Sequence, residues 1–173
     1  EDAYYLVIHS GSRHLGVEVE RYYHELAHER TKDVVPYEFA YLEGEEFANY
    51  LHDMNIVQDF AELNRQAIAD DILKNLKFTL LESFSTIHNY IDVENKILRK
   101  GAISTQEGER IIVPLNMRDG CLICVGKGNE EWNCSAPHGS GRAYNRADTT
   151  NSFTLSQYKK EMKGIYSTSI SKD

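Results

Sequence analysis

Three of the seven histidines stand beside small or glycine-rich turn residues, a setting that suits a functional imidazole. They are His9 in IHSGSR, His88 in TIHNYI and His138 in APHGSGR. Neutral imidazole is the commonest protein ligand for first-row metal ions. Three such residues suggest convergence on one site. Their linear spacing is too long for a local metal motif, so spacing alone also leaves a structural role open for each.

The segment from His138 to Arg142 is the sharpest local motif, an imidazole followed by two glycines and a guanidinium. Backbone N–H groups in such a turn can cradle phosphate oxygens. Arg142 can bind a phosphate through two parallel hydrogen bonds, and a histidine nitrogen is a competent nucleophile. The motif therefore predicts phosphoryl or nucleotidyl transfer. A tight turn with a surface arginine is the alternative that the motif leaves open.

The net charge of −8 and the pI of about 5.4 are not those of a chain that binds nucleic acid with its whole surface. Any RNA contact needs a local basic cluster, since phosphate contacts dominate such affinity. The candidates next to the glycine-rich turns are Arg13, Arg99, Lys100, Arg142 and Arg146. Scattered solvated charges are the equal alternative. The remaining histidines, His14, His24, His28 and His52, are predicted to lie on solvated helix faces.

The elements that must position these residues are predicted from periodicity and turn residues. An apolar run, Ala3–Ile8, predicts a buried strand that ends at His9. Helices are expected at about Val17–Arg30 and Glu45–Leu76, strands at Ile111–Val113 and Cys121–Val125, and a short helix at Phe153–Lys163 capped by Thr154. Together these elements predict an α+β fold.

The composition limits the class of protein and the compartment to which the chain can belong. Its 173 residues suit one domain, and the balance of 41% hydrophobic with 27% charged residues is typical of a globular chain. No apolar run has the length of a membrane span, and no secretory leader is present. Three cysteines without framework spacing favour a reducing compartment, so a cytoplasmic location is expected. Since the chain begins at Glu1 on a predicted strand, we expect a piece of a longer protein.

Six segments, in this order, resemble the RtcB family of RNA ligases. They are VIHSGSRHLG at 7–16, YLEGEEFANYLHDM leading to LNR at 41–65, IHNYI at 87–91, RKGA at 99–102, VPLNMRDG at 113–120, and APHGSGR with Arg146 at 136–146. The resemblance implies mixed β-sheet layers with packed helices, in a single partial domain over residues 1–173.

The family joins an RNA 3′-phosphate or 2′,3′-cyclic phosphate end to a 5′-hydroxyl end, using GTP and two Mn²⁺ ions. By resemblance, His9 and His88 would be manganese ligands. His138 would attack the α-phosphate of GTP and carry GMP. The GTP or GMP contacts would be Asn89, Asn116, Cys121, His138, Gly139, Ser140 and Gly141, and the RNA or phosphate contacts Arg13, Lys100, Arg142 and Arg146.

The chain departs from the family pattern in two motifs, which suggests a divergent subgroup. It has HGSGR where HGAGR is common, with Ser140 as the change, and residues 116–119 replace a GSMG-like guanosine loop. The family's DxxC and NHF motifs and a late Lys and Tyr are absent, so we expect a carboxy-terminal fragment that is inactive alone.

An intact ligase would act in tRNA splicing or RNA repair on tRNA-like ends. An archease-like activator is a possible partner, and no association with a membrane is expected. A catalytically lapsed RNA-binding scaffold and a metal-dependent phosphohydrolase with the same histidines are the alternatives.

Overall fold

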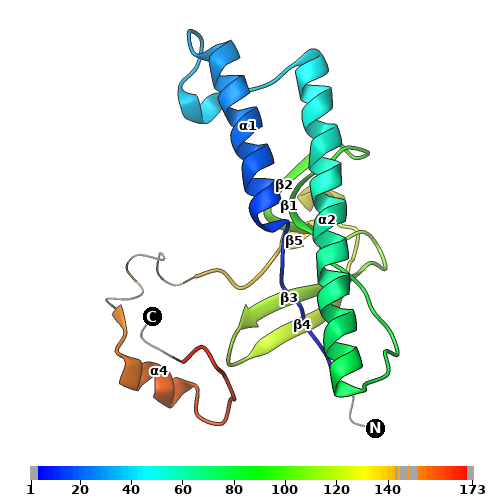
Figure 1. The fold of residues 1–173 in the computed structure, drawn as a ribbon, viewed down its shortest axis with the longest axis vertical. Coiled ribbons are helices and arrows are strands. Elements are labelled where there is room, and N and C mark those ends of the chain that lie inside the picture. The colour runs from blue at the N-terminus through cyan, green and yellow to red at the C-terminus, as the bar shows by residue number, and fades with distance from the viewer. Residues whose placement is uncertain (1–3, 143, 145–147, 149–151, 171–173) are drawn as a thin grey trace. The chain divides into compact units, whose positions relative to one another are not determined.

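The computed structural model describes residues 4–142, 144, 148 and 152–170. The chain divides into two compact units, residues 1–83 and 84–173. Helices build the first unit and antiparallel strands dominate the second (Figure 1). The predicted α+β class is therefore confirmed, whereas the single partial domain over residues 1–173 stays a prediction. Among the described residues, no helix has both the length and the apolar character that crossing a bilayer requires.

The first unit is an antiparallel helical hairpin (Figure 1). Its elements are α1 (Arg13–Thr31), the short 3₁₀ helix η1 (Tyr37–Phe39) and α2 (Gly44–Leu76). Tyr23 and Ala27 of α1 and Met54 of α2 are buried, and the Tyr23 hydroxyl donates a 2.7 Å hydrogen bond to Asp53 on α2. Both predicted helices are confirmed, although α1 begins earlier than the apolar stripe indicated. The stripe shows which face is buried and does not mark where the helix starts.

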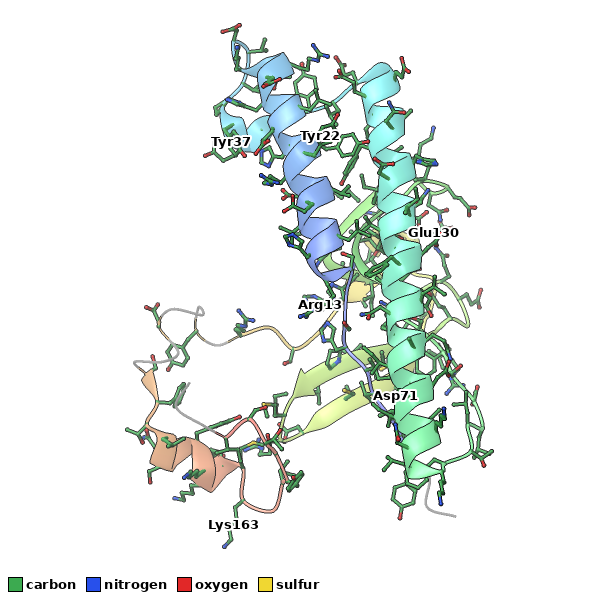
Figure 2. The ribbon with its side chains drawn as sticks, viewed as in Figure 1. Arg13, Tyr22, Tyr37, Asp71, Glu130 and Lys163 are labelled. Carbon is green, nitrogen blue, oxygen red and sulfur yellow. The ribbon has the colours of Figure 1, made fainter. Side chains whose placement is uncertain are left out.

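Two histidines that were predicted to be solvated instead hold the connection between the helices. The Nε2 atom of His24 donates to the Tyr37 carbonyl at 3.0 Å, and the two rings stack with centroids 4.2 Å apart. His28 meets the same tyrosine edge-on at 4.9 Å, and Figure 2 shows Tyr37 beside α1. The backbone hydrogen bond raises the pKa of His24. The prediction is wrong for these two, because the returning loop covers their face of α1.

The strand predicted at Ala3–Ile8 is wrong over its described residues, 4–8, which form no strand. Tyr4 is 94% exposed, and Tyr5, Leu6 and Val7 are exposed as well. An apolar run becomes a strand only when a neighbour completes its backbone hydrogen bonds. No segment in the described part of the chain pairs with residues 4–8.

The second unit contains two antiparallel sheets. The first has the order β1-β2-β5, from His88–Asp92, Ile97–Ser104 and Ser135–Pro137, and the second pairs β3 (Arg110–Asn116) with β4 (Gly120–Val125). A 3₁₀ turn, η2 (Glu130–Trp132), precedes β5, and α4 (Leu155–Glu161) begins with a capping box at Thr154. The predictions of β3, β4 and α4 are confirmed. The three strands of the first sheet, which begin at His88 and end just before His138, were not predicted.

Arg99 on β2 is the buried polar centre of the second unit, with only 2% of its surface exposed. Its guanidinium donates to Asp92 at 2.7 Å, to the Tyr90 hydroxyl at 3.1 Å and to Ser135 at 3.0 Å, joining all three strands of the sheet. The expectation that Arg99 contributes to a surface basic cluster is wrong, because its charge is used inside the sheet. Burial raises the pKa of Asp92, but hydrogen bonds from Arg99 and Asn95 outweigh it and hold the pKa below its usual value.

Replacing Arg99 by Met should lower the free energy of unfolding by about 3 kcal/mol, because one partner of a buried ion pair is removed while the other stays. A lower urea midpoint measures the loss. Arg118→Met is the matched control, since Arg118 is an exposed residue of the same unit that pairs with Asp119 and Glu161. We expect no resolvable change of midpoint for this control.

The loss should also depend on pH. Because the pKa of Asp92 is lowered in the folded state, its contribution is present above about pH 4 and disappears as the pH falls further. The difference in stability between the wild type and Arg99→Met should therefore shrink in acid. A difference that is unchanged at about pH 3 would contradict this assignment.

Candidate functional site

Two of the three candidate imidazoles lie side by side in the second unit. The ring centroids of His88 and His138 are 4.7 Å apart, and the planes are tilted by 36°. Strand β2 brings them together, because His88 is opposite Ile103 and Pro137 is opposite Ala102 in its two ladders. Residues far apart in the sequence thus meet at one end of a three-stranded sheet.

The backbone of Gly101 holds the His138 ring. Its carbonyl accepts hydrogen bonds from the His138 backbone N–H at 3.2 Å and from the ring Nδ1 at 2.7 Å. A carbonyl can only accept, so Nδ1 must carry the proton of the neutral ring. The lone pair is then on Nε2, which is the ring atom available for nucleophilic attack or metal binding.

Asn89 lies at an irregular point of β1, where the register with β2 shifts between His88 and Tyr90. Its φ of +58° is in the left-handed region, which asparagine tolerates better than most residues. The side-chain Oδ1 accepts from the Gly101 N–H at 2.6 Å. Because Oδ1 faces the sheet, the two amide N–H donors of Asn89 are the part that could contact a phosphate.

The glycine-rich loop after His138 lies against β3. Ser140 donates to the Pro114 carbonyl through its N–H at 3.3 Å and to the Leu115 carbonyl through Oγ at 2.6 Å. A Cβ on Gly139 would lie 3.1 Å from the Pro114 oxygen, which is tighter than normal packing. The N–H groups of His138 and Ser140 therefore serve the fold, and a phosphate cradle would rest on those of Gly139 and Gly141.

Asn116 and Cys121 lie in the β3–β4 hairpin. The Asn116 Oδ1 accepts from the backbone N–H groups of Arg118 and Asp119, each at 2.9 Å, so the side chain builds the turn. Cys121 is opposite Pro114 in the ladder. These contacts are structural, and the guanosine contact expected for both residues stays a prediction.

The four basic candidates have different positions. Lys100 on β2, next to Gly101, and Arg142 after the glycine-rich loop are both exposed in the second unit. Arg13 begins α1 in the first unit with a φ of +56° (Figure 2). Backbone strain of this kind clusters at functional positions. Arg146 lies outside the described residues.

The third candidate histidine, His9, belongs to the first unit and is exposed. The loop that follows it is held by α2: Asn64 donates to Ser10 Oγ at 2.9 Å and to the Gly11 carbonyl at 3.5 Å, and Arg65 donates to the Ser10 carbonyl at 3.1 Å. Neither Asn64 nor Gly101 was predicted to be a site residue. A glycine inside a strand is the signal that could have pointed to Gly101, because such a residue often marks a close backbone approach.

The histidine pair fits only part of a manganese shell. Nowhere in residues 4–142, 144, 148 and 152–170 do three or more His, Cys, Asp or Glu side chains gather as metal ligands would. Imidazole accepts first-row metals, but manganese also favours carboxylate, carbonyl or water oxygens. The second unit could thus offer two imidazoles to such an ion, and its described residues gather no third His, Cys, Asp or Glu ligand beside them.

A mixed α+β protein with paired imidazoles beside a glycine-rich loop has the groups needed for chemistry on phosphates. The family model described as tRNA-splicing ligase RtcB matches residues 1–172, and the chain belongs to this family. The chain is 33% identical over 177 residues to RNA-splicing ligase RtcB of Escherichia coli strain K12, covering 89% of this chain and 43% of that protein.

Two proteins of Escherichia coli strain ATCC 25922 are also similar. RNA-splicing ligase RtcB1 is 32% identical over 89% of this chain and 43% of its own length. RNA-splicing ligase RtcB2 is 28% identical over 83% of this chain and 37% of its own length. The chain thus spans less than half of the curated relatives it matches. No solved structure matches it significantly.

Asn64→Asp should loosen the loop after His9, because an ionised carboxylate cannot donate to Ser10 or Gly11. We expect the amides of residues 10–16 to exchange with solvent about five- to tenfold faster, since a lost hydrogen bond is worth about 1 kcal/mol. Hydrogen exchange with mass spectrometry measures this. Asn75→Asp is the matched control, because Asn75 lies on the same helix and donates only within it, to Asp71. Equal exchange in both variants would contradict the anchoring role.

Proposed function

We propose that the intact protein is a GTP- and manganese-dependent RNA ligase that acts through a guanylylated His138. It joins RNA 3′-phosphate or 2′,3′-cyclic phosphate ends to 5′-hydroxyl ends, in tRNA splicing or RNA repair. Membership of the RtcB family supports this proposal. The observation that carries it is the hydrogen bond from His138 Nδ1 to the Gly101 carbonyl, which leaves the lone pair on Nε2 of a ring centred 4.7 Å from that of His88.

The first chemical step uses that lone pair. His138 Nε2 attacks the α-phosphorus of GTP, the N–P bond forms, and the bond to the pyrophosphate oxygen breaks. The imidazole becomes positively charged as the bond forms, and the proton on Nδ1 stays hydrogen-bonded to the Gly101 carbonyl. This bond strengthens as charge develops, so it favours the transition state over the ground state.

The next two steps transfer GMP to RNA and seal the strand. The RNA 3′-phosphate attacks the guanylylated histidine, and the N–P bond breaks as GMP moves to the RNA end. The 5′-hydroxyl then attacks this activated phosphate and expels GMP. The amide N–H groups of Asn89 and the side chains of Lys100 and Arg142 would contact phosphate groups, with Arg13 and Arg146 as further RNA contacts.

Manganese would neutralise the triphosphate charge and polarise the phosphorus under attack. His9 and His88 would hold these ions together with ligands from outside the described residues. Because the chain spans 43% of its ligase relatives, we propose that residues 1–173 alone are inactive. RNA is the proposed partner, and an archease-like protein is the proposed activator.

Incubation of the intact protein with α-labelled GTP and Mn²⁺ tests the proposal. The label should bind covalently, survive base, be released by acid and be absent from His138→Ala, because a histidine phosphoramidate is labile to acid. His52→Ala is the matched control, since this exposed histidine of α2 should leave labelling unchanged. An intact protein that takes no label is instead a scaffold, and phosphate release from RNA without joining identifies a hydrolase.

His88→Ala should raise the Mn²⁺ concentration for half-maximal labelling at least about tenfold, because loss of a ligand costs no less than loss of a residue that merely supports one. A titration of labelling against Mn²⁺ measures the shift. His14→Ala is the control, since its side chain is exposed on α1. If both variants need the same Mn²⁺ concentration as the wild type, His88 is not a metal ligand.

A further inference from the structure

We propose that Gly101 and Asn89 are positioning residues for His138: the Gly101 carbonyl sets the tautomer and direction of the ring, and Asn89 holds Gly101 in place through its backbone N–H. The inference rests on the proposed function, because the ring that they hold is the proposed nucleophile. It assigns roles to a backbone group and to a side-chain oxygen that touch no reacting atom.

The Gly101 carbonyl makes a double contact with His138. The Gly101 oxygen accepts from the His138 backbone at 3.2 Å and from its ring at 2.7 Å. The two bonds fix the residue at its main chain and at its side chain simultaneously. Rotation of the ring would break the Nδ1 bond, and exchange of the ring proton to Nε2 would place a lone pair against the carbonyl oxygen. Either change would remove the lone pair from the side of the ring that faces away from Gly101.

Gly101 has a backbone conformation that favours glycine. Its φ of +66° within β2 is one that residues with a Cβ rarely adopt. A Cβ at this position would meet the His138 ring at 3.6 Å, which is ordinary contact. A side chain therefore fits the space, and the constraint lies in the backbone. An alanine at position 101 would favour a negative φ, and this change would turn the carbonyl of residue 101 away from the His138 ring.

Asn89 holds the Gly101 backbone N–H through its side-chain oxygen. At the register shift in β1, its side-chain oxygen accepts a hydrogen bond from the Gly101 N–H at 2.6 Å. Asn89 thus holds the N–H of Gly101, and the carbonyl on the other side of the Gly101 Cα holds His138. This role uses only Oδ1, so it can be separated from a phosphate contact, which needs the amide N–H groups.

The ring tautomer provides a test that does not depend on activity. In the intact protein with ¹⁵N-labelled histidine and no nucleotide, long-range ¹H–¹⁵N spectra should show His138 protonated on Nδ1. Gly101→Ala and Asn89→Gly should lose this signature, whereas Asn89→Asp, which keeps the acceptor oxygen, should retain it. Gly108→Ala is the matched control, because Gly108 also has a positive φ, +79°, and open space at its Cβ.

Labelling kinetics provide the second readout. With saturating GTP, Gly101→Ala and Asn89→Gly should form the labelled histidine roughly 10–100-fold more slowly than the wild type, the range in which supporting groups usually act. For Gly101→Ala the GTP concentration for half-maximal rate should change by less than about twofold, because the ring acts in the chemical step and not in binding. Asn89→Gly also loses the amide N–H groups proposed to contact phosphate, so this concentration should rise for that variant. Gly108→Ala should label at the wild-type rate.

The outcomes separate the two proposals. If the wild type takes no label, the proposed function fails, and the tautomer spectra still decide the positioning role. If the wild type is labelled, while Gly101→Ala and Asn89→Gly keep both the Nδ1 proton and the wild-type rate, the positioning inference is overturned. If Gly101→Ala does not fold, as judged by its melting temperature against Gly108→Ala, the tautomer spectra of Asn89→Gly and Asn89→Asp decide the question. Both variants lose the amide N–H donors, and only Asn89→Asp keeps the acceptor oxygen.

Discussion

The second unit depends on the central position of β2, which pairs antiparallel with β1 on one side and β5 on the other. Along this strand, alternate residues form one set: Arg99 joins the three strands, Gly101 holds the His138 ring, and Ile103 is buried. Arg99 and Ile103 are buried through their side chains, and Gly101 between them acts through its backbone carbonyl. One strand thus combines the buried ion pair, the contact to the candidate nucleophile and the apolar anchor.

This arrangement divides the basic residues of β2 between the interior and the surface of an acidic chain. Arg99, which seemed a candidate for contacting RNA, is neutralised internally by Asp92. Its neighbour Lys100 points to the other face and is exposed, so adjacent positions of one strand divide a structural charge from a surface charge. Of these two neighbouring basic residues, only Lys100 adds positive charge to the surface. Counting the basic residues of the segment therefore overestimates its surface charge.

The two candidate histidine segments are supported in different ways. The His138 ring is held by a backbone carbonyl in a sheet, whereas the loop after His9 is held by side chains of a long helix, Asn64 and Arg65. A backbone contact constrains a residue through strand register and glycine conformation. A side-chain contact from a helix constrains a loop through spacing along that helix. The first support contacts the ring of the proposed nucleophile, whereas the second contacts only the loop after the proposed ligand.

The sequence by itself determined the elements with a regular apolar pattern and the residue types of the site. The apolar stripe of α2, the hairpin strands β3 and β4 and the Thr154 cap were predictable, because each signal is local. The resemblance also selected His88 and His138 before their rings were seen to be adjacent.

Only the tertiary structure decided how these residues are held. Strand β2 carries two adjacent basic residues and a glycine, so its pattern does not indicate a buried strand, and its place between β1 and β5 depends on partners distant in the chain. The same reason explains the error at residues 4–8, where an apolar run lacked a partner in the described part of the chain. Hydrogen bonding between strands is non-local, and so are the tautomer of His138 and the burial of Arg99 that follow from it.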